Sequence, residues 1–140
     1  MTEANVLTRM LHAVDLLDWP TVKDSVTDPV RMDYTSLWGG EPETVAADEL
    51  ISRWTEFTDG LAATQHLTGP LLVDGDRVET HVIAHHWRPD NANGDAWTVY
   101  GHYTARLADG KVSELILHTY RAEGAADLPR IDGKRAPRHS

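Results

Sequence analysis

The stretch AATQHLTGP, residues 62–70, lies where the chain changes from helical to strand-like patterning. Before it, apolar residues recur at three- and four-residue spacing, which is typical of amphipathic helices. After it, apolar and polar residues alternate between turn-forming segments, which indicates antiparallel strands. The stretch therefore separates a mainly helical half from a half that is all sheet. It also carries His66 between strand-like residues, so a strand can present an imidazole to an interior.

Upstream of this stretch, the pattern predicts three helices and one strand. The elements are expected over residues 6–17, 18–26, 28–36 and 46–58. Asp18 is a candidate N-cap of the second helix, with Pro20 in its first turn. Alternation along the strand places Val30, Met32 and Tyr34 on one face.

Downstream, the alternation predicts four long strands joined by two tight turns and, at residues 89–95, a polar loop. They are expected over residues 61–73, with a break at Gly69-Pro70, and over 77–88, 96–107 and 112–121. Two helices, a strand, a helix and then a run of strands is an α+β order, with the helices packed on one side of a curved sheet. Residues 1–121 are expected to form one domain, and residues 122–140, which lose all periodicity, a C-terminal tail.

Composition excludes several classes of protein. With 140 residues the chain suits a single core, and its formal net charge of −9 argues against nucleic acid as a partner. It has no cysteine, which excludes disulfides and thiolate metal sites. The N-terminus lacks the pattern of a signal peptide, and no apolar run approaches the roughly 20 residues of a membrane span. A cytoplasmic protein without membrane partners is expected.

Strand parity indicates which polar residues face the interior. His86 shares a face with Val78, Val82 and Ala84, so it should point inward. The direction of His66 stays ambiguous, because Leu67 and Leu71 lie on the opposite face of the strand and are themselves candidates for burial. A lone inward histidine is more often structural than catalytic. Two histidines and Tyr34 converging on one interior make a small-molecule site an equally good interpretation.

A carboxylate partner for these histidines can come from the first helix. Asp15 lies at the edge of the apolar stripe of that helix, and a buried aspartate beside a histidine fixes its tautomer and makes the free nitrogen a better base. A solvated helix-edge acid is the competing interpretation. Asp18 lies nearer the middle of the stripe, but the Trp19-Pro20 that follows favours a capping role.

Metal and cofactor sites receive no support from the motifs. His81, His85 and His86 are close in sequence, but only the first two share a strand face, and no well-placed acid completes a ligand set. The chain has no GxGxxG, no P-loop and no G-x-S-x-G motif. We therefore expect no metal and no cofactor.

At this point the chain resembles a known group. The element order, together with DLLDWPTVKD, VRMDYTSLWGG, ATQHLTGP and the strand through His86, resembles the nuclear transport factor 2-like superfamily, and within it the SnoaL-like and scytalone dehydratase-like branch. The resemblance covers about residues 10–90, and its hairpin pattern extends to about 121. It implies a cone-shaped barrel, in which a strongly curved mixed or antiparallel sheet packs against three helices and encloses a pocket.

The resemblance also implies roles for individual residues. His66 would be the general acid and base, Asp15 the aspartate that orients it, and Tyr34 a tyrosine that polarises a substrate carbonyl directly or through water. His86 would be a second catalytic histidine of the pocket. The expected substrate-binding walls are Val30, Met32, Trp38, Trp97 and Tyr103.

Two positions and the C-terminal segment depart from the branch. Val14 stands where the dehydratase has a second tyrosine, and Gly101 falls near its pocket asparagine. The residues after 121 contain no aromatic segment of the kind that closes the family pocket. These differences concern the substrate and the reaction type, and they leave the Asp15–His66 base unaffected.

The expected function is that of a cofactor-independent lyase, isomerase or cyclase. It would abstract a proton next to a carbonyl of a small apolar or polyketide-like compound, and elimination, isomerisation or ring closure would follow. The alternative is a non-catalytic ligand-binding or dimerisation module of the same fold. Epoxide hydrolysis would need an Asp–Arg–Asp set that the inward positions do not supply. Because an open curved sheet favours self-association, a homodimer or homotrimer is expected.

Overall fold

A computed structural model of the chain describes residues 4–128. Four helices lie in the N-terminal half, and seven strands form a single sheet. The helices are α1 (Asn5–Asp15), α2 (Trp19–Asp24), α3 (Thr35–Trp38) and α4 (Ala47–Thr58). The strands are β1 (Val26–Asp33), β2 (Glu43–Val45), β3 (Ala63–Thr68), β4 (Leu72–Asp74), β5 (Arg77–Trp87), β6 (Ala96–Ala108) and β7 (Lys111–Gly124).

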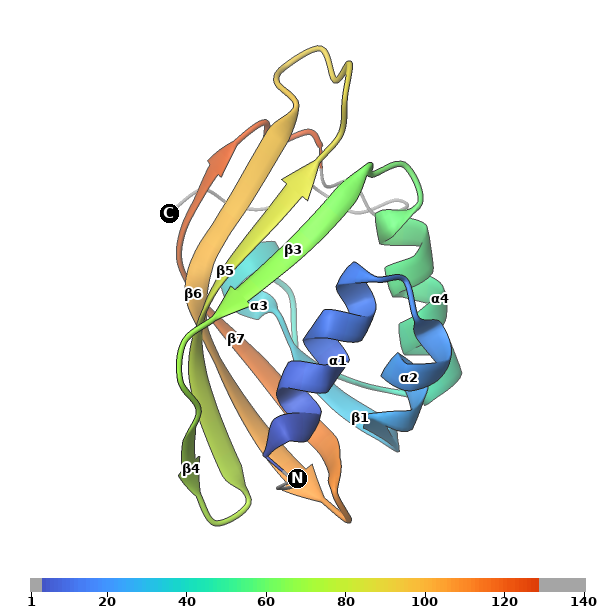
Figure 1. Cartoon of the computed structure of the whole chain (residues 1–140), viewed down its shortest axis with the longest axis vertical. Coiled ribbons are helices and arrows are strands. Elements are labelled where there is room, and N and C mark those ends of the chain that lie inside the picture. Colours follow the sequence, from blue (N-terminus) through green and yellow to red (C-terminus); the bar gives the residue numbers. More distant parts are fainter. Residues whose placement is uncertain (1–3, 129–140) are drawn as a thin grey trace.

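The sheet is mixed and open, and the helices cover one of its faces. Its order is β2-β1-β7-β6-β5-β3, with β4 added to β5. Only the β1–β7 pair is parallel, and every other pair is antiparallel. Figure 1 shows α1, α2 and α4 on the same side of the curved sheet, while the opposite face has no helix over it. The predicted α+β architecture is confirmed, although the sheet does not close into a barrel.

The curvature of the sheet has a local cause in β6 and β7. Their register shifts between Tyr100 and Gly101, which is a β-bulge and bends the pair. A Cβ atom on Gly101 would lie 2.2 Å from the carbonyl oxygen of His118. Only glycine permits this close approach of the two strands, so Gly101 helps to set the concave face on which the pocket forms.

The end of α1 fixes the position of Asp15. The N–H of Leu17 donates to the carbonyl of Val14, and that of Asp18 to the carbonyl of Ala13, a Schellman arrangement with Leu17 in the left-handed region at φ 56°. Asp15 is therefore the last residue of the helix. The sequence pattern extends the buried stripe to Leu17, and this is wrong: Leu17 is 56% exposed, because the chain turns before it.

Asp18 starts α2, as predicted. Its Oδ1 accepts from the backbone N–H of Thr21 at 3.2 Å, and its Oδ2 from the Thr21 hydroxyl at 2.6 Å. These bonds satisfy a free N–H group of the first helical turn. Asp18 is thereby occupied as a cap, and Asp15 is the acid available to the sheet.

Other element boundaries differ from the predictions. The strand expected over 28–36 gives way after Asp33 to the short helix α3, and β2 lies in a segment expected to be a loop. The last strand ends at Gly124 rather than 121, and Ala125 and Leu128 beyond it are buried. Small apolar residues without a clear period conceal this extension. The rest of the expected tail, residues 129–140, lies outside the described residues.

Candidate active site

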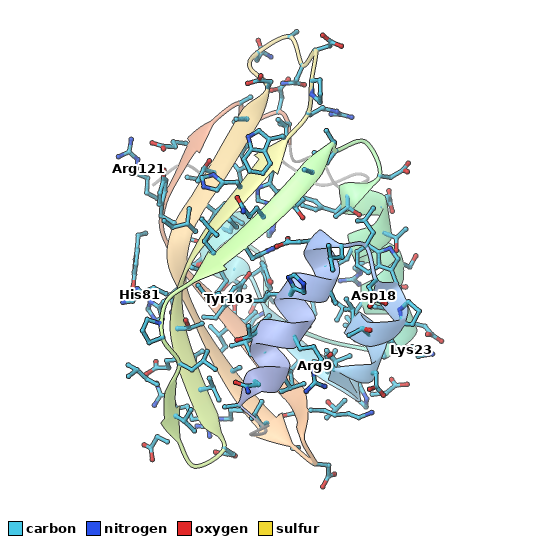
Figure 2. All side chains as sticks on the ribbon, viewed as in Figure 1. Arg9, Asp18, Lys23, His81, Tyr103 and Arg121 are labelled. Atoms are coloured by element: carbon cyan, nitrogen blue, oxygen red, sulfur yellow. The ribbon has the colours of Figure 1, made fainter. Side chains whose placement is uncertain are left out.

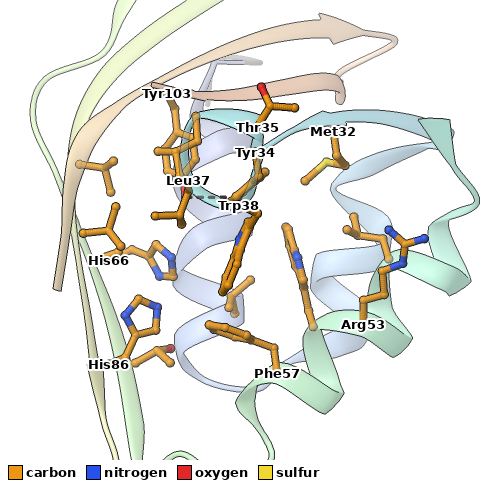
Figure 3. Close-up of a pocket in the computed structure, with 18 of the residues that line it drawn as sticks. Met32, Tyr34, Thr35, Leu37, Trp38, Arg53, Phe57, His66, His86 and Tyr103 are labelled. Carbon is orange, nitrogen blue, oxygen red and sulfur yellow. Dashed lines mark hydrogen bonds between the residues drawn. The ribbon is translucent and has the colours of Figure 1, made fainter. Parts of the chain in front are cut away.

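A cavity of about 250 Å³ lies between the helices and the concave face of the sheet. Its walls are largely apolar and aromatic, and they come from α1, α3, α4 and the central strands. Figure 3 shows His66 and His86 next to each other on one side of this pocket, with Arg53 on the opposite side. Most of the residues expected in the site line it, namely Met32, Tyr34, Trp38, His66, His86, Trp97 and Tyr103. A small, partly enclosed apolar cavity with few polar groups suits a small organic ligand.

Asp15 and His66 are in direct contact at the edge of this pocket. The Asp15 Oδ1 lies 2.7 Å from His66 Nδ1, and Asp15 Oδ2 accepts from the backbone N–H of His66 at 2.7 Å. The Thr64 hydroxyl donates to Oδ1 at 2.9 Å. The side chain of Asp15 is 15% exposed and that of His66 is 12% exposed, so the pair is largely shielded from solvent. The ambiguous parity of β3 is resolved: His66 faces inward with Thr64, whereas Leu67 is exposed.

These contacts determine the protonation of the pair. Burial raises the pKa of Asp15, but the hydrogen bonds and charge of His66, with the Thr64 hydroxyl, outweigh burial and lower the pKa below its usual value. Asp15 is therefore a carboxylate, which can only accept, and His66 Nδ1 must carry the hydrogen between them. In the neutral ring, Nε2 then holds a lone pair. His66 lines the cavity, so this nitrogen is a candidate base.

His86 has a different electrostatic environment. Its Nδ1 lies 3.1 Å from the backbone carbonyl of Trp97, which can only accept, so Nδ1 carries a hydrogen. Burial, assisted by the charge effect of the nearby His66, lowers the pKa of His86 to about 3. The ring is therefore neutral at ordinary pH, with a lone pair on Nε2. Neutral His86 can accept a hydrogen bond in the pocket, but it has no proton to give from Nε2.

Two tyrosines form the third polar group of the pocket. The hydroxyls of Tyr34 and Tyr103 lie 3.3 Å apart, and both residues line the cavity. Tyr34 stands at the junction of β1 and α3, and Tyr103 comes from the middle of β6. Burial raises the pKa of Tyr34 well above its usual value and that of Tyr103 to about 12. Both are therefore neutral hydrogen-bond donors at physiological pH.

The walls agree with the expectation except at one position. Trp38 contacts Phe57 and Trp97 edge-on or tilted, with ring centroids 6.3 and 6.1 Å apart. Val30 does not line the cavity. It is 1% exposed and pairs with Val45 of β2, so it belongs to the core beneath the pocket. Inward parity on β1 was correct for Val30, but parity does not distinguish a core position from a pocket position.

Sequence reasoning missed Thr64 and Arg53. The spacing T-x-H on a strand puts Thr64 and His66 on one face, which is the signal that could have indicated Thr64 as a partner of the same acid. Arg53 lines the pocket from α4, and its guanidinium is bound by Glu43 and, at 3.0 Å, by Glu49. No sequence pattern indicated Arg53, because its contact with Glu43 depends on the unpredicted β2.

Among residues 4–128, no group of three or more histidine, aspartate or glutamate side chains is arranged to hold a metal ion. None of the helices in that same part of the chain is long and apolar enough to span a membrane.

Solved structures with the same fold are numerous. The chain is 26% identical to the Kfla4162 protein from Kribbella flavida, over 91% of this chain and 94% of that one, with a TM-score of 0.79. A putative scytalone dehydratase from Novosphingobium aromaticivorans is 15% identical, covers 86% and 83% of the two chains, and gives a TM-score of 0.71. An epoxide hydrolase of M. tuberculosis is 13% identical over 84% and 82%, with a TM-score of 0.70. The last two show likeness of fold alone.

A comparison with curated proteins gives no significant match. The sequence model of the SnoaL-like domain, in contrast, matches residues 4–111, which include α1, the pocket strands β3 and β5, and all of β6. This range also contains Asp15, Tyr34, His66 and His86. The chain therefore belongs to the SnoaL-like family.

Proposed function

We propose that this protein is a cofactor-independent acid–base enzyme that abstracts a proton next to a carbonyl of a small, neutral, largely apolar compound. The observation that carries the proposal is the Asp15–His66 contact of 2.7 Å beside an aromatic-walled cavity. An oriented imidazole with its free nitrogen towards a shielded cavity is the arrangement that general base catalysis requires. Dehydratase, isomerase and cyclase chemistry all begin with this proton transfer.

In the first step, His66 Nε2 takes the proton from the carbon and becomes an imidazolium. Asp15 stabilises this cation, since its carboxylate already accepts the Nδ1 hydrogen. Electrons of the broken C–H bond move into the carbonyl, which becomes an enolate. A hydroxyl of the Tyr34–Tyr103 pair donates to the enolate oxygen, where the negative charge develops.

The second step returns the proton from His66. In an elimination, the imidazolium protonates a departing hydroxyl, the enolate electrons form the new double bond, and water leaves. In an isomerisation, the same proton is delivered to another carbon. His86, a neutral acceptor, positions a substrate hydroxyl rather than donating a proton. This role is narrower than that of the second catalytic histidine expected from the sequence.

The first step can be tested without knowing the natural substrate. 2-Tetralone is a flat, neutral bicyclic ketone with acidic C–H bonds, and its hydrogen–deuterium exchange in D₂O is followed by NMR. We expect the protein to accelerate exchange, and His66→Ala to abolish the acceleration while the circular dichroism spectrum stays unchanged. His85→Ala is the matched control, because His85 bonds to Thr98 on the outer face of the sheet. Full exchange activity in His66→Ala would contradict the proposed mechanism.

A binding module of the same fold is the alternative. The same cavity could hold 2-tetralone without acting on it, and the protein would then bind the ketone but leave its exchange rate at the value in buffer. His66→Gln would in that case bind about as well as the wild type. Under the enzymatic proposal, the wild type both binds the ketone and exchanges it.

Self-association as a dimer or trimer stays a prediction. The uncovered face of the sheet is the surface proposed for it, and Tyr120, which is 52% exposed, lies there in contact with His81 and His102. Figure 2 shows His81 on this side of the sheet, pointing away from the helices. Sedimentation of the wild type and of Tyr120→Glu tests it: a monomeric wild type would contradict the prediction.

A further inference from the structure

The two phenols of the pocket have one free hydrogen between them. Each hydroxyl has a single hydrogen to donate. At 3.3 Å, the Tyr34 and Tyr103 hydroxyls share one of the two hydrogens, and either oxygen could be the donor. Among residues 4–128, no other hydrogen bond of either hydroxyl is present. The second hydrogen is therefore left for a ligand, and the direction of the Tyr34–Tyr103 bond decides which tyrosine presents it.

The position of the base favours Tyr103. A carbonyl oxygen and the carbon next to it are only about two bond lengths apart, so the donor to that oxygen must lie close to the base. The negative charge of Asp15 contributes to the raised pKa of Tyr103. Figure 3 likewise shows Tyr103 on the side of the pocket where His66 lies, with Tyr34 nearer the middle. The Tyr103 hydroxyl is thus the phenol nearer the Asp15–His66 pair.

We propose that Tyr103 is a further catalytic residue: its hydroxyl donates directly to the substrate oxygen on which negative charge develops. Tyr34 is then a positioning residue, whose hydroxyl donates to Tyr103 and makes it a stronger donor. This assignment rests on the proposed proton abstraction by His66. It differs from the role implied by the family resemblance, in which Tyr34 polarises the carbonyl and Tyr103 is a wall.

The acidity of the two phenols agrees with this direction. Burial raises the pKa of both, but the bond between them lowers the pKa of Tyr103 and raises that of Tyr34. A phenol that accepts a hydrogen bond becomes more acidic, because the bond stabilises its phenolate, so these opposite effects correspond to Tyr34 as the donor and Tyr103 as the acceptor. The hydrogen bond donated by Tyr34 then polarises the hydroxyl of Tyr103, so that Tyr34, Tyr103 and the ligand form a short cooperative chain of hydrogen bonds.

Binding of 4-nitrophenolate tests the proposal without turnover. Its oxygen carries delocalised negative charge as an enolate does, and its absorbance reports both binding and ionisation. At pH 8, Tyr103→Phe should weaken phenolate binding by roughly ten- to hundredfold, the range of a lost hydrogen bond to a charged group. Tyr34→Phe should weaken it by no more than about fivefold, since Tyr103 still donates. Tyr100→Phe, on the outer face beside Glu123, is the matched control.

The double variant gives a further readout that a merely structural role would not produce. If Tyr34 acts only through Tyr103, the double variant should bind phenolate as weakly as Tyr103→Phe alone. A larger loss in Tyr34→Phe than in Tyr103→Phe would overturn the proposal, as would additive losses or the absence of phenolate binding by the wild type. Should Tyr103→Phe fail to fold, 3-fluorotyrosine at position 103, a stronger donor, should tighten binding, and at position 34 should leave it nearly unchanged.

Failure of this inference is distinct from failure of the proposed function. The ketone exchange reports the base, and phenolate binding reports the donor. If ketone exchange depends on His66 but phenolate binding depends on Tyr34, the proposed enzymatic function stands and only the role of Tyr103 is contradicted. If phenolate binding depends on Tyr103 but the protein does not accelerate ketone exchange, the proposed enzymatic function is contradicted and the cavity is a binding pocket.

Discussion

The carboxylate of Asp15 bonds both the imidazole ring and the backbone N–H of His66. One carboxylate oxygen lies 2.7 Å from the ring Nδ1, and the other accepts the backbone N–H at 2.7 Å. The contact joins the last residue of α1 to the middle of β3. The backbone bond fixes the position of Asp15 against the strand, and turning the ring would break the bond between Oδ1 and Nδ1. A base held in this way has its direction fixed before the ligand enters, which reduces the reorganisation that proton transfer costs.

Removing the charge of Asp15 should impair catalysis strongly. In Asp15→Asn the imidazolium loses its counter-ion, so the 2-tetralone exchange rate should fall by roughly a hundredfold or more, within the range assigned to acid–base groups. NMR in D₂O measures the rate. Asp18→Asn removes the same charge three residues away, where the carboxylate caps α2. Equal rates in wild type and Asp15→Asn would show that the base is elsewhere.

The cap residue should affect stability rather than activity. Asp18→Ala removes the acceptor of the Thr21 N–H, which should lower the free energy of unfolding by about 1 kcal/mol. Urea unfolding followed by circular dichroism measures this loss, and the exchange rate below the unfolding midpoint should match that of the wild type. A variant of unchanged stability but low exchange would mean that Asp18, not Asp15, serves the site.

Thr64 should contribute to catalysis by holding the carboxylate of Asp15 in place. Thr64→Val keeps the shape of the side chain but removes the hydroxyl that donates to Oδ1 at 2.9 Å. With one donor fewer, Asp15 holds His66 less firmly, and the exchange rate should fall roughly tenfold. Thr68→Val, on the same face of β3, is the control. If both variants are equally active, the Thr64 hydroxyl has no part in orienting the pair.

The buried His86 should make the fold sensitive to acid. Burial, assisted by His66, lowers the pKa of His86 from 6.5 to about 3. Between these values the unfolded chain binds a proton that the folded chain does not, so the free energy of unfolding falls as the pH drops. The loss attributable to His86 is up to about 1.4 kcal/mol per pH unit. Urea unfolding at pH 7.5 and pH 5 should show a smaller loss in His86→Gln, and identical losses would contradict a neutral buried His86.

Periodicity in the sequence predicted the elements that pack through one regular face. The long strand β5 alternates cleanly, so the inward direction of His86 and the outward direction of His85 could be assigned. The order of helices and strands, with its resemblance to a known family, then indicated the fold. The capping role of Asp18 followed from residue type and the proline behind it.

The remaining features depend on contacts that no local pattern records. The strand β2 has three residues, and Thr35–Trp38 forms a helix of one turn, so neither produces a measurable period. The direction of His66 was undecided because Leu67 and Leu71 suggested an inward face opposite to it, and Leu67 is in fact exposed. The Tyr34–Tyr103 contact joins positions 69 residues apart, which only the folded sheet brings together.

One measurement tests the central claim most directly: ¹⁵N NMR of the histidine rings at pH 8, recorded while 2-tetralone is added. The account predicts that His66 carries its hydrogen on Nδ1, facing Asp15, and that its unprotonated Nε2 signal moves as the ketone fills the cavity, while the His85 signals stay in place. A hydrogen on His66 Nε2, or an Nε2 signal that does not respond to saturating ketone, would contradict it.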